Sequence, residues 1–495
     1  MGVGQTHSTN EPGERRWWKL LAELGEERGL TKRNMLQQNP HQTQSWNEVG
    51  QTALQRVREV ARKDRCTRFT SLMHHLSPSR LKHHFFEIKR NAAPGVDGIT
   101  WHDYEQSLDE NIMALHSRLQ SGGYRAKPSR RVFIPKPNSE KRPLGIAALE
   151  DKIVQRATVE VLNAIYEVDF KGFSYGFRPK KKAHEALDAL AVGIRFKKIS
   201  YIYDVDIRKY FDSINHDWLM KFLSHRIADK RMLRLIKKWL KAGVLENGNF
   251  SKSEIGSPQG ASISPLLSNI YLHYVLDLWV QAWRNRKARG NVIIVRWADD
   301  FVVGFQYRED ALAFQSILSQ RFEKFGLNIH PDKSRLIRFG KFAKRDRLRF
   351  DKKSKPETFD FLGFTHCCTV NRNGKFQVLR LTIKSRFRRK LSELKSEMKR
   401  RMHLPVSLQG KWLRAVLQGH MNYYAIPCNL PLVGMFRTQL IRLWYKTLKR
   451  RSQKSRLNWS KMPLTADKYL PKARVLHPWP ERRFEVMTRG RSPVR

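Results

Sequence analysis

The stretch "NVIIVRWADDFVVGF", residues 291–305, constrains the fold of this chain more than any other segment. Two apolar runs, each long enough for a buried strand, flank Asp299 and Asp300. Adjacent carboxylates repel each other in a low-dielectric setting, so this arrangement is costly unless a cation lies between them. Only Arg296 is near them in the sequence. The segment therefore predicts a β-hairpin with a metal site at its turn.

A third carboxylate follows another predicted strand. "YIYDVDIRKYFDSI", residues 201–214, alternates as a strand does up to Asp206 and then becomes helical. The twist of a hairpin turn can aim Asp299 and Asp300 at one site, and Asp206 can approach from an adjacent strand. Three carboxylates suit two hard divalent cations, which sit about 3.5–4 Å apart in two-metal sites that transfer phosphoryl groups. An Asp-Asp pair alone is typical of a solvated turn, but the apolar strands and Asp206 favour the metal site.

The charge of the chain identifies the class of partner. The sequence has 95 Lys and Arg against 45 Asp and Glu, a formal net charge of +50. Such an excess is typical of proteins that bind a polyanion, nucleic acid before a membrane surface. No apolar stretch approaches the roughly 18–20 residues of a membrane span, and the first residues lack a signal-peptide core. The four cysteines have no zinc-site spacing, so we expect a soluble protein of a reducing compartment.

The carboxy-terminal quarter concentrates this charge. Residues 367–495 hold 31 Lys or Arg and 5 Asp or Glu. In "SRFRRKLSELKSEMKRRM", apolar residues from Phe387 to Met402 recur at helical spacing, and the opposite face is almost wholly basic. "IRLWYKTLKRRSQKSRL" adds seven cations among aromatic residues and no acid. We therefore expect an all-helical domain that lies along nucleic acid, preceded by a mixed α+β domain over residues 85–365.

Several motifs in order carry a family resemblance. "DVDIRKYFDS", "GSPQGASISPLLSNIYL", "VRWADDFVVGF", "GLNIHPDKS" and "FDFLGF" resemble the successive motifs of reverse transcriptases encoded by bacterial group II introns. "NAAPGVDGIT", "RRVFIPKPNSEKRPLGI" and "FKGFSYGFRPKKKAHEAL" resemble the fingers of that family. The resemblance implies an α+β right-hand polymerase fold in which a helical thumb or maturase domain follows the fingers and palm. We expect a partly flexible amino-terminal extension at 1–64, fingers and palm at 65–366, thumb at 367–465 and a short basic tail, a candidate DNA-binding segment, at 466–495.

The resemblance also implies roles for individual residues. The metal ligands for two Mg²⁺ ions would be Asp206, Asp299, Asp300 and the backbone carbonyl of Ile207. The nucleotide would meet Arg131, Lys136, Arg142, Phe211, Gln259 and Gly260. Phe211 would stack under the sugar and exclude a 2′-hydroxyl, and Lys333 would protonate the leaving pyrophosphate. The primer end would be gripped by Phe361, Leu362, Gly363 and Phe364. Nucleic acid would be bound by Arg388, Arg389, Lys395, Lys399, Arg442, Lys446, Lys449 and Arg450.

Each of these roles has a structural alternative. For Phe211 and the two phenylalanines of "FLGF" the alternative is core packing, and for Lys136 and Arg142 it is surface charge on a hairpin. Gln259 and Gly260 also suit a helix-capping loop. The chain departs from the family at Trp297, where a tyrosine is usual; the carboxylates are intact, so we expect primer positioning or fidelity to differ rather than catalysis. We also expect no zinc-supported HNH nuclease domain, because the end of the chain lacks paired cysteines.

The function implied by the resemblance is that of an RNA-directed DNA polymerase and maturase, acting in the bacterial cytoplasm and on nucleoid DNA. Its partners would be the intron RNA, an RNA template with a DNA primer or target DNA, and dNTPs, without a membrane. One alternative is a non-catalytic splicing maturase, which the three intact aspartates disfavour. The other is a retron or diversity-generating type of reverse transcriptase, which the basic helical extension disfavours. The particular intron RNA, the DNA target, the fidelity and the oligomeric state do not follow from the sequence.

Overall fold

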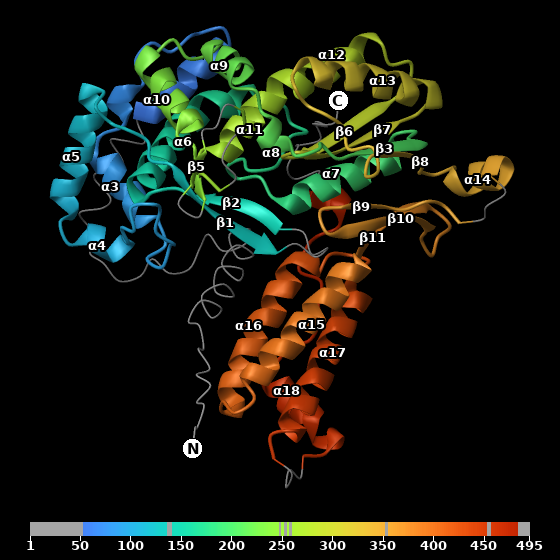
Figure 1. Ribbon diagram of the computed structural model, residues 1–495. Coiled ribbons are helices and arrows are strands. Elements are labelled where there is room, and N and C mark those ends of the chain that lie inside the picture. The colour runs from blue at the N-terminus through green and yellow to red at the C-terminus, as the bar shows by residue number, and fades with distance from the viewer. Residues whose placement is uncertain are drawn as a thin grey trace, which may run out of the picture. The chain divides into compact units, whose positions relative to one another are not determined.

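The computed structural model describes residues 53–135, 141–246, 249–251, 255–256, 260–351, 355–452 and 457–483. These residues form two compact units. The larger unit contains residues 53–381 and 479–483, and the smaller contains residues 382–478. The larger unit is mixed α+β and the smaller is helical apart from its first residue, so the expected class of fold is observed at this level (Figure 1).

The central sheet of the larger unit is built from the two segments that the sequence singled out. Its four strands pair antiparallel in the order β6 (Val292–Trp297), β7 (Asp300–Phe305), β3 (Tyr201–Val205) and β8 (Arg335–Arg338). Helix α7 (Ala183–Phe196) packs on β6, where Gly193 lies against Ile293, and helix α13 (Arg308–Lys324) packs on β7 and β3. Helices that cover the sheet explain why β6 reads as a continuous apolar run rather than an alternating one.

Two further sheets belong to the larger unit. One has the order β2 (Lys141–Ile146), β1 (Ser129–Pro135), β4 (Val244–Glu246) and β5 (Asn249–Ser251), and its β1–β2 pair is the hairpin expected from "SRRVFIPKPNSEKRPLGIAAL". The other has the order β11 (Phe376–Thr382), β10 (Phe364–Val370) and β9 (Phe359–Phe361). Thr382, the last residue of β11, is the first residue of the smaller unit.

The remaining helices of the larger unit, apart from the one at residues 343–351, share one apolar core with the central sheet. Several begin at a side chain that accepts a backbone N–H, such as Ser77 before α3, Thr100 before α4 and Asp229 before α10. Their bounds are η1 (Met73–His75), α3 (Pro78–Phe86), α4 (Trp101–Glu105), α5 (Leu108–Ser121), α6 (Leu149–Asp169), α8 (Tyr210–Ser213), α9 (His216–Ser224), α10 (Lys230–Lys241), α11 (Ser264–Leu272), the π-helical turn η2 (His273–Asp277), α12 (Leu278–Arg286) and α14 (Ala343–Asp351).

The smaller unit is a set of helices around a core of its own. Its elements are α15 (Lys384–Arg400), α16 (Val406–Tyr424), α17 (Leu430–Lys449), η3 (Trp459–Lys461) and α18 (Met462–Tyr469). Trp444 is fully buried, and its indole N–H donates to the amide oxygen of Gln409 at 2.9 Å, so that the polar edge of the ring is satisfied inside the core. Gly410 packs against the ring of Tyr469 and ties α16 to α18.

The division between the units lies later in the chain than the expected boundary at 366/367. That boundary falls inside β10, whose pairing with β9 and β11 keeps residues 367–381 in the larger unit. The expected tail at 466–495 also begins inside a folded element, because Ala466 and Leu470 are buried in the helical core. Residues 1–52 and 484–495 lie outside the described residues. Of the expected extension at 1–64, residues 53–63 form a helix whose Leu54 joins the core of the larger unit.

None of the helices in the described ranges has the length and apolar character needed to cross a lipid bilayer.

Candidate active site

The turn between β6 and β7 carries both adjacent aspartates. Trp297 pairs with Asp300, so the loop has two residues, Ala298 and Asp299. Ala298 has a φ of 57°, a left-handed conformation that tight two-residue hairpin loops require. Asp299 therefore lies in the loop itself and Asp300 is the first residue of β7. The expected hairpin with its acidic turn is present in the structure.

Strand β3 brings further carboxylates to the same place. Val205 pairs with Phe301, and the next step of this antiparallel register puts Asp206 opposite Asp300. Asp204 lies two residues before Asp206, so the three side chains share one face of the sheet. The pKa of Asp204 is raised to about 7: burial is the largest cause, Arg335 opposes it, and the negative charges of Asp300, Asp360 and Asp206 add to it. Negative charge is therefore concentrated on this face, as a cation site requires.

The backbone of Ile207 faces this cluster. Ile207 forms an isolated antiparallel bridge with Ile329, flanked by bonds from the N–H of Arg208 to the carbonyl of Asn328 and from the N–H of His330 to the carbonyl of Asp206, both 2.8 Å. In a pair flanked in this way, the N–H and C=O of the bridged residue point away from its partner. Since Ile329 lies on the β8 side of β3, the carbonyl of Ile207 points to the side of β7 and the acidic turn.

A buried arginine supports the turn from beneath. Arg296 and Asp277 are both fully buried, and the guanidinium of Arg296 donates to the two carboxylate oxygens of Asp277 at 2.8 and 2.6 Å. Arg296 Nη1 also donates to the carbonyl of Ala298 and to the amide oxygen of Asn269, each at 2.9 Å. Gly176 is against the same turn, where a Cβ would come within 2.4 Å of the Ala298 nitrogen. The left-handed residue is thus held by a charged donor and by a glycine that leaves room for it.

Lys333 lies beside the carboxylates. Its ammonium group is 3.4 Å from Asp206 Oδ2, with the lysine side chain 63% and the aspartate side chain 33% exposed. The side chain of Ser334 then anchors the same strand end by accepting the N–H of Asp206 at 3.1 Å. An exposed pair of this kind is worth little stability, about 0–1 kcal/mol, so it neutralises Asp206 without holding it rigidly.

The donor set fits hard divalent cations. Carboxylate oxygens and a backbone carbonyl are the ligands that Mg²⁺ takes in proteins, and this face offers them from two adjacent strands. Among the described residues, no three Asp, Glu, His or Cys side chains are already gathered closely enough to hold an ion. The register puts Asp206 and Asp300 on one face of the sheet, but among the described residues their carboxylates are not gathered into a formed metal site.

The residues expected to meet the nucleotide are only partly described. Phe211 lies in α8, half-buried, with its ring 5.4 Å from that of Tyr210 in an edge-on arrangement. Gly260 has a φ of 107°, and a Cβ there would be 2.6 Å from the Gly145 carbonyl of β2, so only glycine fits this approach. Arg131 pairs with Glu246 of β4 at 3.2 Å. Lys136 and Gln259 lie outside the described residues, as does the side chain of Arg142.

Comparison with known proteins identifies the family that part of this chain matches. Residues 134–366, which contain the hairpin, β3 and β8, match the family described as reverse transcriptase (RNA-dependent DNA polymerase). Residues 134–366 are a reverse transcriptase domain. The chain is 39% identical over 238 residues to the protein YkfC of Escherichia coli (strain K12), a match that covers 42% of this chain and 62% of YkfC.

Other relatives of the reverse transcriptase domain are intron proteins. Identity is 39% over 193 residues with the group II intron-encoded protein LtrA of Lactococcus lactis subsp. cremoris, covering 38% of this chain and 32% of LtrA. It is 43% over 195 residues with an uncharacterized 91 kDa protein in a cob intron of Schizosaccharomyces pombe, covering 39% of this chain and 24% of that protein. The chain thus spans less than two thirds of each of these relatives. The resemblance to group II intron-encoded reverse transcriptases inferred from the motifs is confirmed.

The last motif of the reverse transcriptase domain forms a tight turn. Phe361 pairs with Phe364, and Leu362 and Gly363 between them have φ values of 47° and 84°. Phe361 and Phe364 are 4% and 0% exposed, so both rings pack into the protein. The structure thus fits core packing for the two phenylalanines; Gly363 is buried as well, and Leu362 is the partly exposed residue of this motif.

Basic side chains cover the outer faces of two helices in the smaller unit. Leu394 and Met398 of α15 are buried, each only 3% exposed to solvent, and Phe387 and Leu391 pack beside them. Every cation expected to bind nucleic acid is exposed: Arg388, Arg389, Lys395 and Lys399 on α15, Arg442, Lys446 and Lys449 on α17, and Arg450 at its end. Arg389 lies 3.6 Å from Glu393, a weak pair that leaves the face strongly positive.

Two groups of the reverse transcriptase domain were not found from the sequence. Asp204 was visible in principle, because strand alternation puts it on the same face as Asp206. The partnership of Asp277 with Arg296 has no local signal, because the two residues lie on different elements and meet only in the folded core. The π-helical turn that ends at Asp277 is an irregularity of the kind often found at functional sites.

Proposed function

We propose that this protein is an RNA-directed DNA polymerase of a group II intron, and that it also binds the intron RNA to assist splicing. The observation that carries the polymerase half is the register of β3 and β7, in which Asp206 lies opposite Asp300 beside the Asp299 turn, within a reverse transcriptase domain. Its substrates would be dNTPs and an RNA template with a DNA primer or target DNA.

The proposed metal ligands are Asp206, Asp299, Asp300 and the carbonyl of Ile207, holding two Mg²⁺ ions. When bound, the ions would activate the primer hydroxyl and stabilise the leaving oxygen. The chain's own contribution is positional, since Arg296 fixes the Ala298 carbonyl and thereby the turn. The ion pair between Lys333 and Asp206 supports a role for this lysine in the site, where we propose that it protonates pyrophosphate.

The polymerase half is tested by replacing Asp299 and Asp300 with Asn together. Neutral amides cannot hold two divalent cations against their hydration, so cDNA synthesis should disappear. RNA binding should persist, because the basic surfaces are unchanged. Primer extension and filter binding on one preparation measure both. Residual synthesis above a trace would refute the metal assignment.

The maturase half is carried by the basic faces of α15 and α17. Lysine and arginine on these faces would bind phosphates without reading bases, each lost contact reducing the slope of log affinity against log salt by about 0.7–0.9. Selectivity for folded intron RNA would come from its shape, because duplex RNA hides its base edges in a deep groove. We propose that the protein acts in the bacterial cytoplasm and reaches nucleoid DNA through the same charge.

The test replaces Arg388, Arg389, Lys395 and Lys399 with Gln. All four are exposed and the apolar face of α15 is kept, so the fold should survive. Splicing stimulation should fall much further than extension of a pre-annealed short primer. Should both activities fall in parallel at every salt concentration, this unit is only a polymerase thumb and the maturase half is wrong.

A further inference from the structure

Helix α10 of the larger unit has an outer face made of cations. Between Lys230 and Lys241 there are six Lys or Arg and no Asp or Glu. Arg234, Lys237, Lys238 and Lys241 recur at intervals of three, one and three residues and so share one face of the helix. The opposite face, with Leu235, Ile236 and Trp239 among its members, is buried in the core.

This face forms one wall of a groove. The other wall is the segment that runs from α5 into β1, and the groove has a volume of about 460 Å³. It is lined by Arg125, Ala126, Pro128, Arg234, Lys237, Lys238, Lys241, Ala242 and Phe250. Five of these residues are cations and none is an acid. Phe250 of β5 is 58% exposed, which leaves an aromatic ring open to solvent at the edge of the charge.

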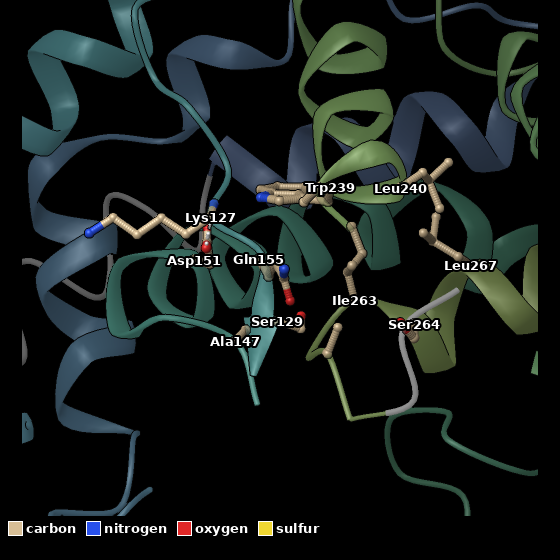
Figure 2. A pocket seen from close by; sticks show the side chains of 12 residues that line it. Lys127, Ser129, Ala147, Asp151, Gln155, Trp239, Leu240, Ile263, Ser264 and Leu267 are labelled. Carbon is tan, nitrogen blue, oxygen red and sulfur yellow. Dashed lines mark hydrogen bonds between the residues drawn. The ribbon is translucent and has the colours of Figure 1, made fainter. Parts of the chain in front are cut away.

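Hydrogen bonds hold the two walls together. Lys238 donates to the carbonyl of Gly122 at 2.9 Å and to that of Tyr124 at 2.5 Å. The indole N–H of Trp239 donates to the Tyr124 hydroxyl at 2.9 Å, and this hydroxyl donates to Asp151. Figure 2 shows a second, small cavity, lined by Trp239 and Asp151 among others, which shares Ala242 with the groove. The groove is therefore part of a fixed scaffold.

The charge of the groove is not neutralised within the described residues. In the part of the chain that the structure describes, no ion pair or hydrogen bond joins Arg125, Arg234, Lys237 or Lys241 to a carboxylate. Four like charges held at neighbouring positions on a rigid surface repel one another, so a surface of this kind indicates an anionic partner that supplies the missing charge. A solvated basic helix face is the simpler interpretation, but it explains neither the concave shape nor the fixed wall opposite.

We propose that this groove binds the phosphate backbone of RNA at a place separate from the polymerase site. Phosphates spaced along a strand suit Arg234, Lys237 and Lys241 along α10 with Arg125 on the opposite wall. The exposed ring of Phe250 offers a platform for an unstacked base. In Figure 1, α10 and the β6–β7 hairpin lie well apart in the larger unit. The groove thus binds RNA that is not being copied. Only the identity of this RNA as intron RNA rests on the proposed function.

The test is the triple variant Arg234→Gln, Lys237→Gln, Lys241→Gln. All three side chains are exposed, and Lys238 is kept because it secures the wall. At 0.15 M salt each lost phosphate contact should weaken binding about four- to fivefold, taking 1 M salt as the reference at which the contact contributes nothing, so three contacts amount to roughly 60- to 120-fold. The matched control is Arg286→Gln, Lys287→Gln, Lys324→Gln, which makes the same charge change on exposed positions of α12, α13 and the residue after α12.

The full chain is titrated with a labelled RNA hairpin carrying a single-stranded tail, and primer extension is measured on a short pre-annealed template. We expect the groove variant to lose RNA affinity, to have a salt slope lower by about 2–3, and to extend the short primer as the parent does. Equal RNA affinity in the parent and the groove variant overturns the proposal, as does an equal loss in the control. Binding of the parent to anionic phospholipid vesicles in preference to RNA also overturns it. An inactive parent whose groove still binds RNA refutes the proposed polymerase and leaves the groove standing.

Discussion

Replacing Asp277 with Ala should destabilise the larger unit strongly and slow DNA synthesis through the acidic turn. In the parent, both oxygens of this carboxylate accept hydrogen bonds from Arg296, and both residues are fully buried. The substitution removes the only carboxylate in these bonds and leaves the guanidinium with two neutral acceptors, Asn269 and the Ala298 carbonyl.

The expected magnitude follows from burial. Removing one partner of a buried, hydrogen-bonded ion pair costs roughly 3–5 kcal/mol, because the remaining charge has lost its compensation and cannot reach water. His273, whose Nδ1 lies 3.9 Å from Asp277, does not substitute for the lost carboxylate, because an imidazole carries no negative charge in either protonation state. An arginine that shifts to find a new partner would also release the Ala298 carbonyl, so we expect kcat to fall with little change in KM for dNTP.

Urea unfolding, followed by a probe in the larger unit, measures the loss of stability. The control is the double variant Asp277→Leu, Arg296→Met, which removes both charges and keeps apolar volume. It should be clearly more stable than Asp277→Ala, since replacing a whole buried pair is often nearly neutral. A loss below about 1 kcal/mol in the single variant, or a double variant as unstable as Asp277→Ala, would show that the pair is not buried as described.

The remaining predictions concern other parts of the larger unit. Phe211→Val should admit ribonucleotides in primer extension; unchanged discrimination between dNTP and rNTP would make this ring only packing. Burial lowers the pKa of His366 to about 3, so the stability that depends on its neutral form is present above about pH 6.5 and is lost as the pH falls toward 3. The loss between pH 7 and 5 is about 2 kcal/mol, and it should vanish in His366→Phe when unfolding is measured at both values. Lys333→Gln should lower the Mg²⁺ concentration needed for half-maximal synthesis by up to about fivefold, because its ammonium competes for Asp206; an unchanged requirement would contradict that competition.

The acidic hairpin was predictable because its signal is local. Apolar strands on either side of a two-residue turn fix both the pairing and the position of the aspartates in the chain. The third carboxylate was also predictable, since Asp206 ends a strand of recognisable alternation. That Asp206 and Asp300 lie on one face depends on β3 being the neighbour of β7 in the sheet. The local sequence pattern does not give this strand order, whereas the resemblance of the motifs to a known family implied it.

The boundary of the helical unit was not predictable in the same way. Residues 364–382 contain mixed polar and apolar side chains of intermediate exposure, and the charge excess that marks the helices begins beside them. Composition therefore predicted a start for the helical unit at residue 367, before Thr382, where the smaller unit begins. Arg131 illustrates the same limit: its pairing with Glu246 depends on β1 lying beside β4, a contact between distant segments that residue type alone does not reveal.

Exposed and buried cations near the acidic turn have different roles. The carboxylates of Asp206 and Asp300 are close enough to Asp204 to help raise its pKa. Lys333 and Arg335 offset this repulsion, because they pair with Asp206 and Asp204 at the edge of the cluster. Those two cations are half or more exposed, so they can move aside when harder cations arrive. Arg296 is different, since it is sealed in the core and tied to Asp277, and it acts on the position of the turn rather than on its charge. Exposed cations can therefore be exchanged for a metal or for phosphates without disturbing the fold, whereas the buried one cannot be changed without moving the aspartates themselves.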